Sequence, residues 1–438
     1  MYSFNKTSIF ILFLFFISYD LKADTLSLQQ AISFTLTHNH GLKVAQIQKE
    51  IAENQATPGN ANLYPKLTLS GGTNYSNQNT AIVFSGNIPK SEVKGAISTG
   101  YNTNLGMTYT LFDGLGVVYN YKKLLAQAEK SNEQWLLTIE NTVIQVINTY
   151  VEILRWQHAV AVQESTLKVS LDRVTRIETG FKLGAKTSLD VLNAKVDFVN
   201  DSINLANAHF QMANLKRNLN WTMGQDIQTD FGVSLPDLSN NLANIDVLIG
   251  ESLKNNRNFV LANLNKEMAK LDYSIANSKR FPVITGNLSY GLSHSSNGAG
   301  IVVSNDATGV SGGVNLNYNL FDGLKVKTQI DNANLLIQSN EELKKESEKT
   351  IARDVYNAWN GYQFSLQQQN SENQHVALAQ LALKRSEEAY KNGQATALEF
   401  RQAQINVINA ETKQYNTGLA VLKYYYELKK LNGSLVAS

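Results

Sequence analysis

The sequence Leu111-Phe112-Asp113-Gly114 ends a run of alternating apolar and polar residues and starts a long run of helix-forming residues. The same four residues return as Leu320-Phe321-Asp322-Gly323, 209 positions later and in the same context. Both copies therefore predict a strand-to-helix junction. A second landmark, Gly184, is repeated as Gly393 at the same offset of 209 residues. Two unrelated landmarks that share one offset indicate an internal duplication of the chain.

The duplication predicts how the 438 residues are organised. We expect one repeat at 24–224 and a second at 247–433, joined by a polar linker at 225–246 and followed by a short end at 434–438. Residues 1–23 have the pattern of a secretory signal peptide, with Lys6 before an apolar block and Ala23 at the expected cleavage point. An uncleaved anchor is the alternative, but the apolar block is well short of the roughly 20 residues that span a bilayer.

Composition argues against several classes of function. The chain has no cysteine, which excludes disulfides, thiol nucleophiles and cysteine-based metal sites. A net charge of +2 gives no sign of a nucleic-acid partner. Among the histidines only His38 and His40 are closely spaced, a pair more typical of a solvated helix end than of a metal site. Phosphate-loop, nucleophile-elbow and dinucleotide motifs are missing, so we expect no enzyme activity, no cofactor and no metal.

Four segments alternate strictly between apolar and polar residues. They are 63–75, 101–111, 284–292 and 310–320. Each has about the length of a tilted transmembrane strand, roughly 9 to 11 residues. One face is small, polar and uncharged, whereas the other carries aliphatic residues and tyrosines, with Tyr75, Tyr101, Tyr290 and Tyr318 at or near the expected strand ends. This pattern predicts barrel strands with lipid outside and water inside, and a soluble sheet with one wet face is the alternative.

Long helices follow each strand pair. Residues 117–179 contain neither glycine nor proline and would form a helix of about 95 Å. The return segment from Leu189 to Ala213 has apolar residues at steps of three and four, which is typical of a coiled-coil seam. Each half is therefore expected to be a strand hairpin followed by an antiparallel helical hairpin with its tip near Gly184 or Gly393. At the N-terminus, Ser27 is expected to cap one helix from residue 28 to about 54.

In this order and spacing the motifs resemble those of the outer membrane efflux protein family, the TolC-like channel-tunnels. The resemblance rests on the tandem repeat, the two junctions, and tips with an aromatic residue three positions before the glycine. Each tip is followed by a matching segment, Leu189-Asp190-Val191-Leu192 in the first repeat and Leu398-Glu399-Phe400 in the second. It implies a membrane α+β fold in which three chains contribute four β-strands each to a twelve-stranded barrel. The barrel would lie in the outer-membrane lipid of a Gram-negative cell, above a helical tunnel in the periplasm.

The resemblance also implies a function and a set of site residues. The homotrimer would be a passive exit duct for drugs, small molecules or polypeptides, docked to a periplasmic adaptor and an inner-membrane pump of the RND or ABC type. At the closed entrance, Tyr390 and Asp190 match a latch, and Glu399 matches an acidic ring around the pore. Ala395 replaces the latch arginine and Gln402 replaces a second acidic residue, so the latch would be weaker and the ring less negative.

Other interpretations remain open for these residues and for the chain. Asp190 is equally consistent with a carboxylate that is favoured by the N-terminus of a helix. Gly184 and Gly393 are explained by the turn alone, and their contact with the adaptor is implied only by the resemblance. An exported trimeric coiled-coil adhesin, or a structural envelope protein, is the rival function. An adhesin would carry its strands once at the C-terminus, whereas here they form two internal pairs. The cargo, the adaptor and the pump cannot be identified from the residues.

Overall fold

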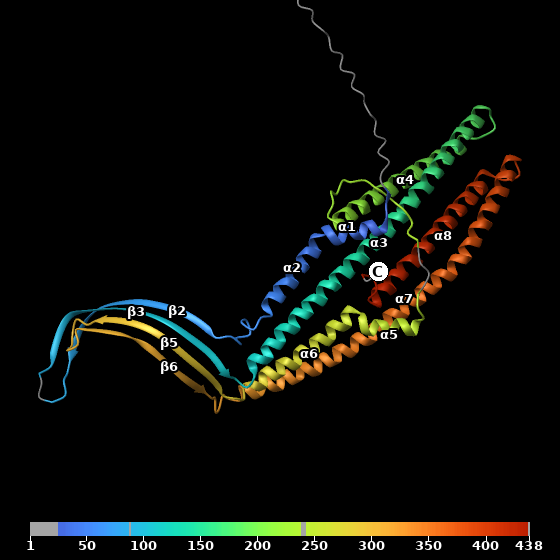
Figure 1. The fold of residues 1–438 in the computed structure, drawn as a ribbon. Helices are drawn as coiled ribbons and strands as arrows, with labels where there is room; N and C mark the ends of the chain where they lie inside the picture. Colours follow the sequence, from blue (N-terminus) through green and yellow to red (C-terminus); the bar gives the residue numbers. More distant parts are fainter. Residues whose placement is uncertain (1–24, 87–88, 238–241, 437–438) are drawn as a thin grey trace, which may run out of the picture. The chain divides into compact units, whose positions relative to one another are not determined.

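The computed structural model describes residues 25–86, 89–237 and 242–436 (Figure 1). The predicted signal peptide at 1–23 lies outside this described part. The chain forms two compact units. The helical unit comprises residues 1–39, 145–240 and 367–423, and the sheet unit comprises 40–144, 241–366 and 424–438. In the described ranges, no helix combines the length and the apolar character that crossing a membrane would require.

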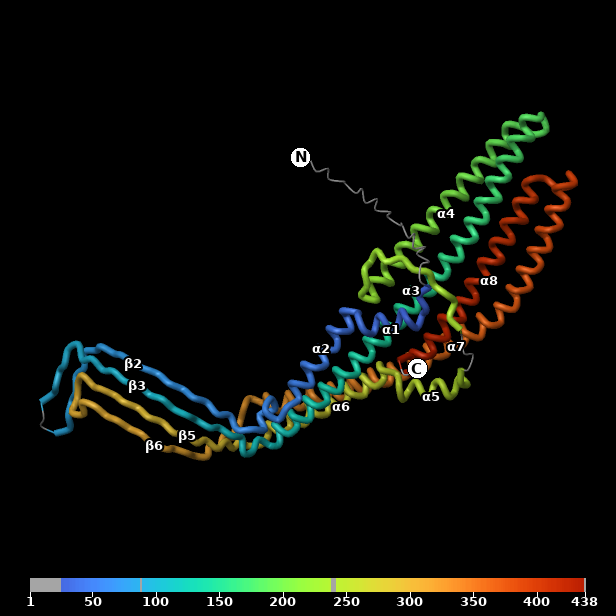
Figure 2. Tube along the Cα trace, turned by 45° about the horizontal axis from the view of Figure 1, so that its top comes forward, coloured from blue at the N-terminus to red at the C-terminus, as the bar shows by residue number. Residues whose placement is uncertain are grey.

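The sheet unit contains one antiparallel sheet whose strands lie in the order β2-β3-β5-β6 (Figure 2). These strands are β2 (Lys66–Ile82), β3 (Ser91–Phe112), β5 (Val283–Ser296) and β6 (Ser304–Asn317). All four predicted strands are therefore present, and they are longer than predicted, at 17, 22, 14 and 14 residues. The prediction that the last strand continues to Leu320 was wrong. Asn317 pairs with Val283, the first residue of β5, and Pro282 before it has no amide to extend the ladder.

The strand register places the apolar residues of all four strands on one face of the sheet. Leu69, Leu105, Tyr290 and Val310 form one row across the four strands. The next row is small and polar, with Ser70, Asn104, Gly291 and Gly309. The apolar row is uncovered at both edges of the sheet, since Leu69 and Val310 are each 71% exposed. The alternation seen in the sequence thus corresponds to two chemically distinct faces.

The predicted positions of the tyrosines were partly wrong. Tyr75, Tyr101 and Tyr290 lie inside β2, β3 and β5, and only Tyr318 follows a strand end directly. The strands extend beyond the alternating stretches, so residues that seemed terminal are internal. Across the sheet, the ring of Tyr101 stacks on His294, whose Nδ1 lies 2.6 Å from Oδ1 of Asp306. A polar row therefore interrupts the apolar face near the end of β5 and the start of β6.

The helices repeat at the offset found in the sequence. The helices α3 (Gly116–Lys182) and α7 (Lys325–Lys391) have 67 residues each, about 100 Å of helix. They turn back into α4 (Ser188–Met223) and α8 (Ala397–Leu431), which run antiparallel to them (Figure 1). The starts of α3 and α7 differ by 209 residues, and so do those of α4 and α8. The duplication is therefore present in the backbone as well as in the motifs.

The predicted N-terminal helix is two helices, α1 (Leu28–His38) and α2 (His40–Gln55). Ser27 caps α1 through the expected capping box with Gln30. The helix ends at Asn39, whose side-chain amide donates a hydrogen bond of 2.7 Å to the carbonyl of Thr222 at the end of α4. This contact joins residues far apart in the chain, which explains why the break has no local signal in the sequence.

The predicted linker contains a short strand. Its residues Gly232–Val233 form β4, which pairs in parallel with β1 (Thr25–Leu26). The fully buried Tyr150 of α3 places its hydroxyl 2.8 Å from the carbonyl oxygens of Leu26 and Ser234. Burial raises the pKa of this Tyr150 hydroxyl. Strand β1 and the predicted linker are thereby held to the same helix.

In the sheet unit, α5 (Ile245–Asn255) and α6 (Arg257–Ser278) complete the helical part. Arg257 forms ion pairs with Glu133 and Glu140 of α3 at 3.0 and 3.4 Å. Glu140 is only 2% exposed, and its burial raises the pKa of the carboxyl while Arg257 opposes that shift. Lys123 of α3 pairs with Asp272 of α6 at 2.6 Å. These contacts hold α6 against the N-terminal half of α3.

Candidate functional site

The two Leu-Phe-Asp-Gly motifs form the same turn. Asp113 accepts a hydrogen bond from the backbone N–H of Val117 at 2.9 Å, and Asp322 accepts one from Val326 at 2.9 Å. Each aspartate therefore caps its long helix. The glycine and the leucine after it have left-handed backbones in both copies, with φ of 71° at Gly114, 68° at Leu115, 69° at Gly323 and 67° at Leu324. Glycine fits this turn because it has no Cβ to oppose a positive φ.

The glycines of the two junctions differ in their surroundings. A Cβ at Gly114 would lie 2.5 Å from the carbonyl oxygen of Ser278 and 2.8 Å from the ring of Phe281, whereas one at Gly323 would meet nothing within 4 Å. We expect Gly323→Ala to lower the free energy of unfolding by about 1–2 kcal/mol, the cost of the positive φ. Gly114→Ala should cost at least twice as much because it also displaces backbone. Denaturant unfolding of both variants checks this, and equal losses would contradict it.

The structure brings the two junctions to one cleft of the sheet unit. Asp113 and Asp322 both line this cleft, whose volume is about 610 Å³, together with Lys279 and Lys325. No local pattern predicts that the two junctions lie close together, since the motifs are 209 residues apart. The predicted junction residues are therefore structural neighbours as well as copies of each other.

The two hairpin tips are exposed turns. Gly184 has φ of 76° and Gly393 has φ of 69°, and a Cβ would meet nothing within 4 Å at either glycine. Each glycine amide donates a hydrogen bond back to the helix that precedes it, to the carbonyl of Phe181 at 3.0 Å and of Tyr390 at 3.1 Å. The turn thus accounts for both glycines. The exposed backbone around them is accessible to a partner.

The acidic residues beside the tips cap the returning helices. Asp190 accepts a hydrogen bond from the backbone N–H of Thr187 at 2.8 Å, and this bond holds the pKa of Asp190 below its usual value. Glu399 accepts the equivalent bond from Thr396 at 2.7 Å, which lowers the pKa of Glu399 in the same way. Both carboxylates therefore stay charged at mildly acidic pH. The helix-terminus interpretation of Asp190 is the one that the contacts of this chain support.

The remaining latch residue lies on the other hairpin. The ring of Tyr390 stacks on Phe400 with 5.4 Å between ring centroids. Within the described residues of one chain, no hydrogen bond joins Tyr390 to Asp190. The structure thus places both residues at exposed tips without bringing them together, and the latch stays a prediction.

A buried ion pair that the sequence analysis missed connects the two helical hairpins. Arg401 of α8 donates to both carboxylate oxygens of Asp201 on α4, at 2.9 and 2.8 Å. The hydroxyl of Ser170 on α3 donates to the same carboxylate. The side chains of Arg401 and Asp201 are only 12% and 8% exposed. Three helices from both repeats therefore share one charged cluster.

The signal for this pair was present but incomplete. Asp201 lies seven residues from Ala194 and from Ala208, which are each 2% exposed, so it occupies a buried heptad position. Arg401 is the charged exception at an otherwise apolar position of the repeat in α8. Each charge alone is compatible with solvent, and only the three-dimensional contact identifies them as partners.

The apolar residues expected to form the seam of the first hairpin lie on its surface. We call them the α4 stripe, and they are 52–64% exposed: Leu189, Leu192, Val196, Val199, Ile203 and Phe210. The buried line of α4 is instead the one through Ala194, Asp201 and Ala208. In α8 the equivalent residues after Leu398 are half-buried or buried. The α4 stripe thus has no partner among the described residues of the chain.

The family model for "Outer membrane efflux protein" matches residues 31–225 and 248–434. The chain belongs to the outer membrane efflux protein family. Outer membrane protein TolC of Escherichia coli K12 is 21% identical over 426 residues, which cover 93% of this chain and 81% of TolC. TolC of Salmonella enteritidis is 21% identical over 420 residues, 93% of this chain and 80% of that protein. Membership makes this an outer-membrane efflux protein with a transport role, in a family of channels and not of enzymes.

Solved structures share the fold at low sequence identity. The Campylobacter jejuni CmeC outer membrane channel superimposes with a TM-score of 0.82 at 14% identity, covering 93% of this chain and 86% of CmeC. A membrane protein from Pseudomonas aeruginosa gives 0.80 at 19% identity, covering 94% of this chain and 91% of that protein. The fold of the single chain is therefore that of the channel-tunnels.

Proposed function

We propose that three copies of this chain form a passive exit duct through the outer membrane. The observation that carries this proposal is the sheet, which has one apolar exposed face and two edges, β2 and β6, without a partner in the described chain. Open sheet edges are not tolerated in lipid, and four strands are too few to close a barrel. Copies that join edge to edge satisfy both requirements, and three copies give the twelve strands expected from the family.

The α4 stripe supports the same assembly. Within one chain, α3 and α8 pack in the helical unit, where both line one cavity. The duplicates of α8 and α3 are α4 and α7, so α4 of one copy is expected to pack on α7 of the next. The surface of α7 fits this role, because Leu378, the equivalent of Val169, is 67% exposed. The exposed stripe and the exposed leucine then cover each other.

Cysteine cross-linking tests this arrangement. The chain has no native cysteine, so only introduced thiols can react. Val199→Cys with Leu378→Cys places thiols at the expected contact between copies. A short bifunctional thiol reagent should then give covalent dimers and trimers on a denaturing gel. The control pair is Val169→Cys with Ile408→Cys, the equivalent positions within one chain, which should react without a ladder. If the control pair is cross-linked within one chain but the test pair gives no covalent dimers or trimers, the proposed interface is contradicted.

The duct would take its cargo from a periplasmic adaptor and an inner-membrane pump of the RND or ABC type. The exposed tips at Gly184 and Gly393 are the proposed contact with the adaptor. The small, uncharged face of the sheet suits many solutes, and drugs and small molecules are the first candidates, with polypeptides second. A deletion strain tested for drug susceptibility and for protein secretion separates the two. Unchanged phenotypes in both assays would contradict an export role.

Proteolysis of intact cells distinguishes the proposed duct from the alternative, an adhesin. In the proposed orientation only residues within 76–98 and 293–308, which comprise the loops between the paired strands and the adjoining strand ends, reach the outside. Protease should therefore cut there and spare the helices. Loss of the helices from intact cells would favour the adhesin.

The proposed latch has a test that avoids the capping role of Asp190. Asp190→Ala should raise single-channel conductance, but it also removes the capping contact with Thr187. Tyr390→Phe removes only the hydroxyl and leaves the stack on Phe400. We expect both variants to raise the conductance if the two residues hold the entrance closed. If only Asp190→Ala raises the conductance, the cause is loss of the helix cap. If neither variant raises it, the proposed latch is contradicted.

A further inference from the structure

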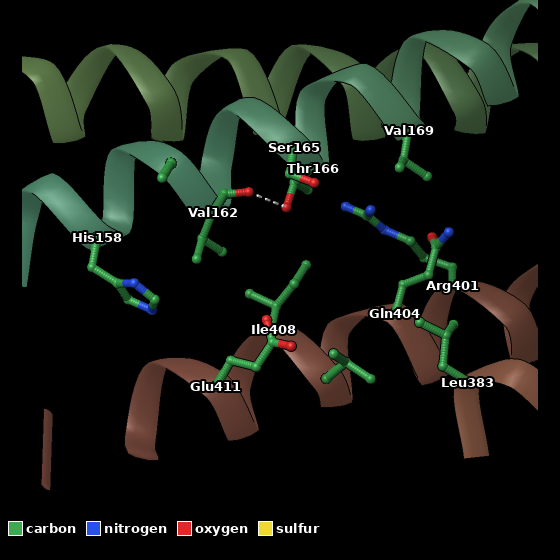
Figure 3. A pocket seen from close by; sticks show the side chains of 12 residues that line it. His158, Val162, Ser165, Thr166, Val169, Leu383, Arg401, Gln404, Ile408 and Glu411 are labelled. Carbon is green, nitrogen blue, oxygen red and sulfur yellow. Dashed lines mark hydrogen bonds between the residues drawn. The ribbon is translucent and has the colours of Figure 1, made fainter. Parts of the chain in front are cut away.

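A cavity of about 360 Å³ lies between α3 and α8 in the helical unit, and Figure 3 shows its lining side chains. In the view of Figure 3, Val162 of α3 and Ile408 of α8 lie in its middle, and Val169 of α3 lies on the side of Arg401. In the view of Figure 3, His158 and Glu411 lie toward one end and Arg401 and Gln404 toward the other. The cavity therefore has an apolar centre and two polar ends, within the size range of small-molecule sites, roughly 300–1,000 Å³.

Two buried polar atoms in this lining have no hydrogen-bond partner within the described chain. They are Nε2 of His158 and Oε1 of Gln404. Buried polar groups are nearly always paired, because burying one without a partner is costly. The ring of His158 is held by a stack on Tyr415 at 4.1 Å, and burial lowers its pKa, so it is neutral near pH 7. The lining thus holds two hydrogen-bonding atoms that no described residue uses. Both are covered by neighbouring atoms, so a ligand reaches them through a small shift of those side chains.

The charges of the lining are unbalanced. Arg401 is already neutralised by Asp201. Glu411 accepts a hydrogen bond of 2.9 Å from Gln380 and forms no ion pair with any residue that the structure describes. The free charge on the cavity is therefore one carboxylate, which favours a cation and disfavours an anion.

We propose that this cavity binds a small amphipathic amine in its protonated form. The apolar body would lie between Val162 and Ile408 in the middle of the cavity. The ammonium would lie near Glu411, with one N–H directed at Nε2 of His158. Such a molecule uses the apolar centre, the carboxylate and the unpaired atom of His158.

The polar groups are particular to this pair of helices. In the other repeat, Ser202 stands at the position of Glu411, Lys195 at that of Gln404, and Gln367 at that of His158. The equivalent positions therefore supply no carboxylate and include a lysine, which would repel an amine. Helix packing alone does not require the three residues, which is consistent with a ligand at this cavity only.

The test uses the full chain in lipid nanodiscs and phenethylamine as the probe, with 2-phenylethanol as the neutral analogue of the same shape. We expect saturable binding of the amine by calorimetry and weaker binding of the alcohol. Glu411→Gln should weaken binding of the amine about tenfold, the equivalent of about 1.4 kcal/mol. The matched control is Glu164→Gln, a carboxylate of α3 that is 59% exposed and outside the lining, which should bind like the parent.

A second variant separates the cavity from partitioning of the probe into lipid. Ile408→Trp fills the apolar centre and should abolish saturable binding, and Val162→Phe serves if the first variant does not fold. Binding that is equal in the parent, Glu411→Gln and the filled variant would overturn the proposal, and so would an alcohol that binds as tightly as the amine. The assay needs only the folded chain, so its outcome is independent of the proposed duct.

Discussion

Asp201→Ala is expected to lower the free energy of unfolding of the helical unit by about 3–5 kcal/mol. The substitution leaves the Arg401 guanidinium, 12% exposed, without its carboxylate partner. It also leaves the hydroxyl of Ser170 without an acceptor. Removing one partner of a buried pair is costly because the other charge stays buried and uncompensated. Denaturant unfolding followed by circular dichroism measures the loss.

The duplication provides controls for this experiment. Glu178→Ala removes the ion-pair partner of Lys195 on α4. Both side chains of that pair are largely exposed, at 40% and 54%, so the loss should be much smaller than for Asp201→Ala. In the other repeat, Ala410 stands at the position of Asp201 and Leu192 at that of Arg401. The double variant Asp201→Ala with Arg401→Leu copies these residues and should recover most of the stability. Equal small losses in both single variants would contradict the importance of the buried pair.

Val199→Glu is expected to prevent assembly and leave single chains. Val199 is 52% exposed in the chain and belongs to the α4 stripe, which is proposed to be covered by the next copy. A carboxylate buried there without a partner would cost several kcal/mol at each of three equivalent contacts. The detergent-corrected mass of the extracted protein measures the effect.

The control for this variant lies one residue further along the helix. Asn200 is exposed and outside the stripe, so Asn200→Glu adds the same charge on a different face of α4. It should keep the mass of the parent. If both variants keep that mass, the α4 stripe is not the contact between copies.

Features that depend on local pattern were predicted from the sequence. The junctions at Asp113 and Asp322 were recognised because the alternation of apolar and polar residues stops at an Asp-Gly pair. In both copies the aspartate caps the helix that follows. The long helices were predicted because glycine and proline are absent from residues 117–179. The break at Asn39 was missed because its cause is a contact with Thr222, which lies 183 residues away. Local patterns fix the elements, whereas contacts between distant segments decide where some of them end.

The site was less predictable for a related reason. Asp190 has the same residue type and the same position whether it caps a helix or ties an entrance, so the sequence cannot distinguish the two roles. The pair of Asp201 and Arg401 joins different repeats across 200 residues. The apolar repeat in α4 predicted a packed helix but not which surface would cover it. In the proposed assembly, that covering surface belongs to the next copy of the chain.

The central claim is that copies of the chain share one barrel, and the mass of the extracted protein tests it most directly. Light scattering on material from the outer-membrane fraction, corrected for detergent, should give three times the chain mass of 48.6 kDa, less the predicted signal peptide. A single-chain mass under mild extraction would leave β2 and β6 as open edges. The sheet could not then span the membrane, and the duct would be contradicted.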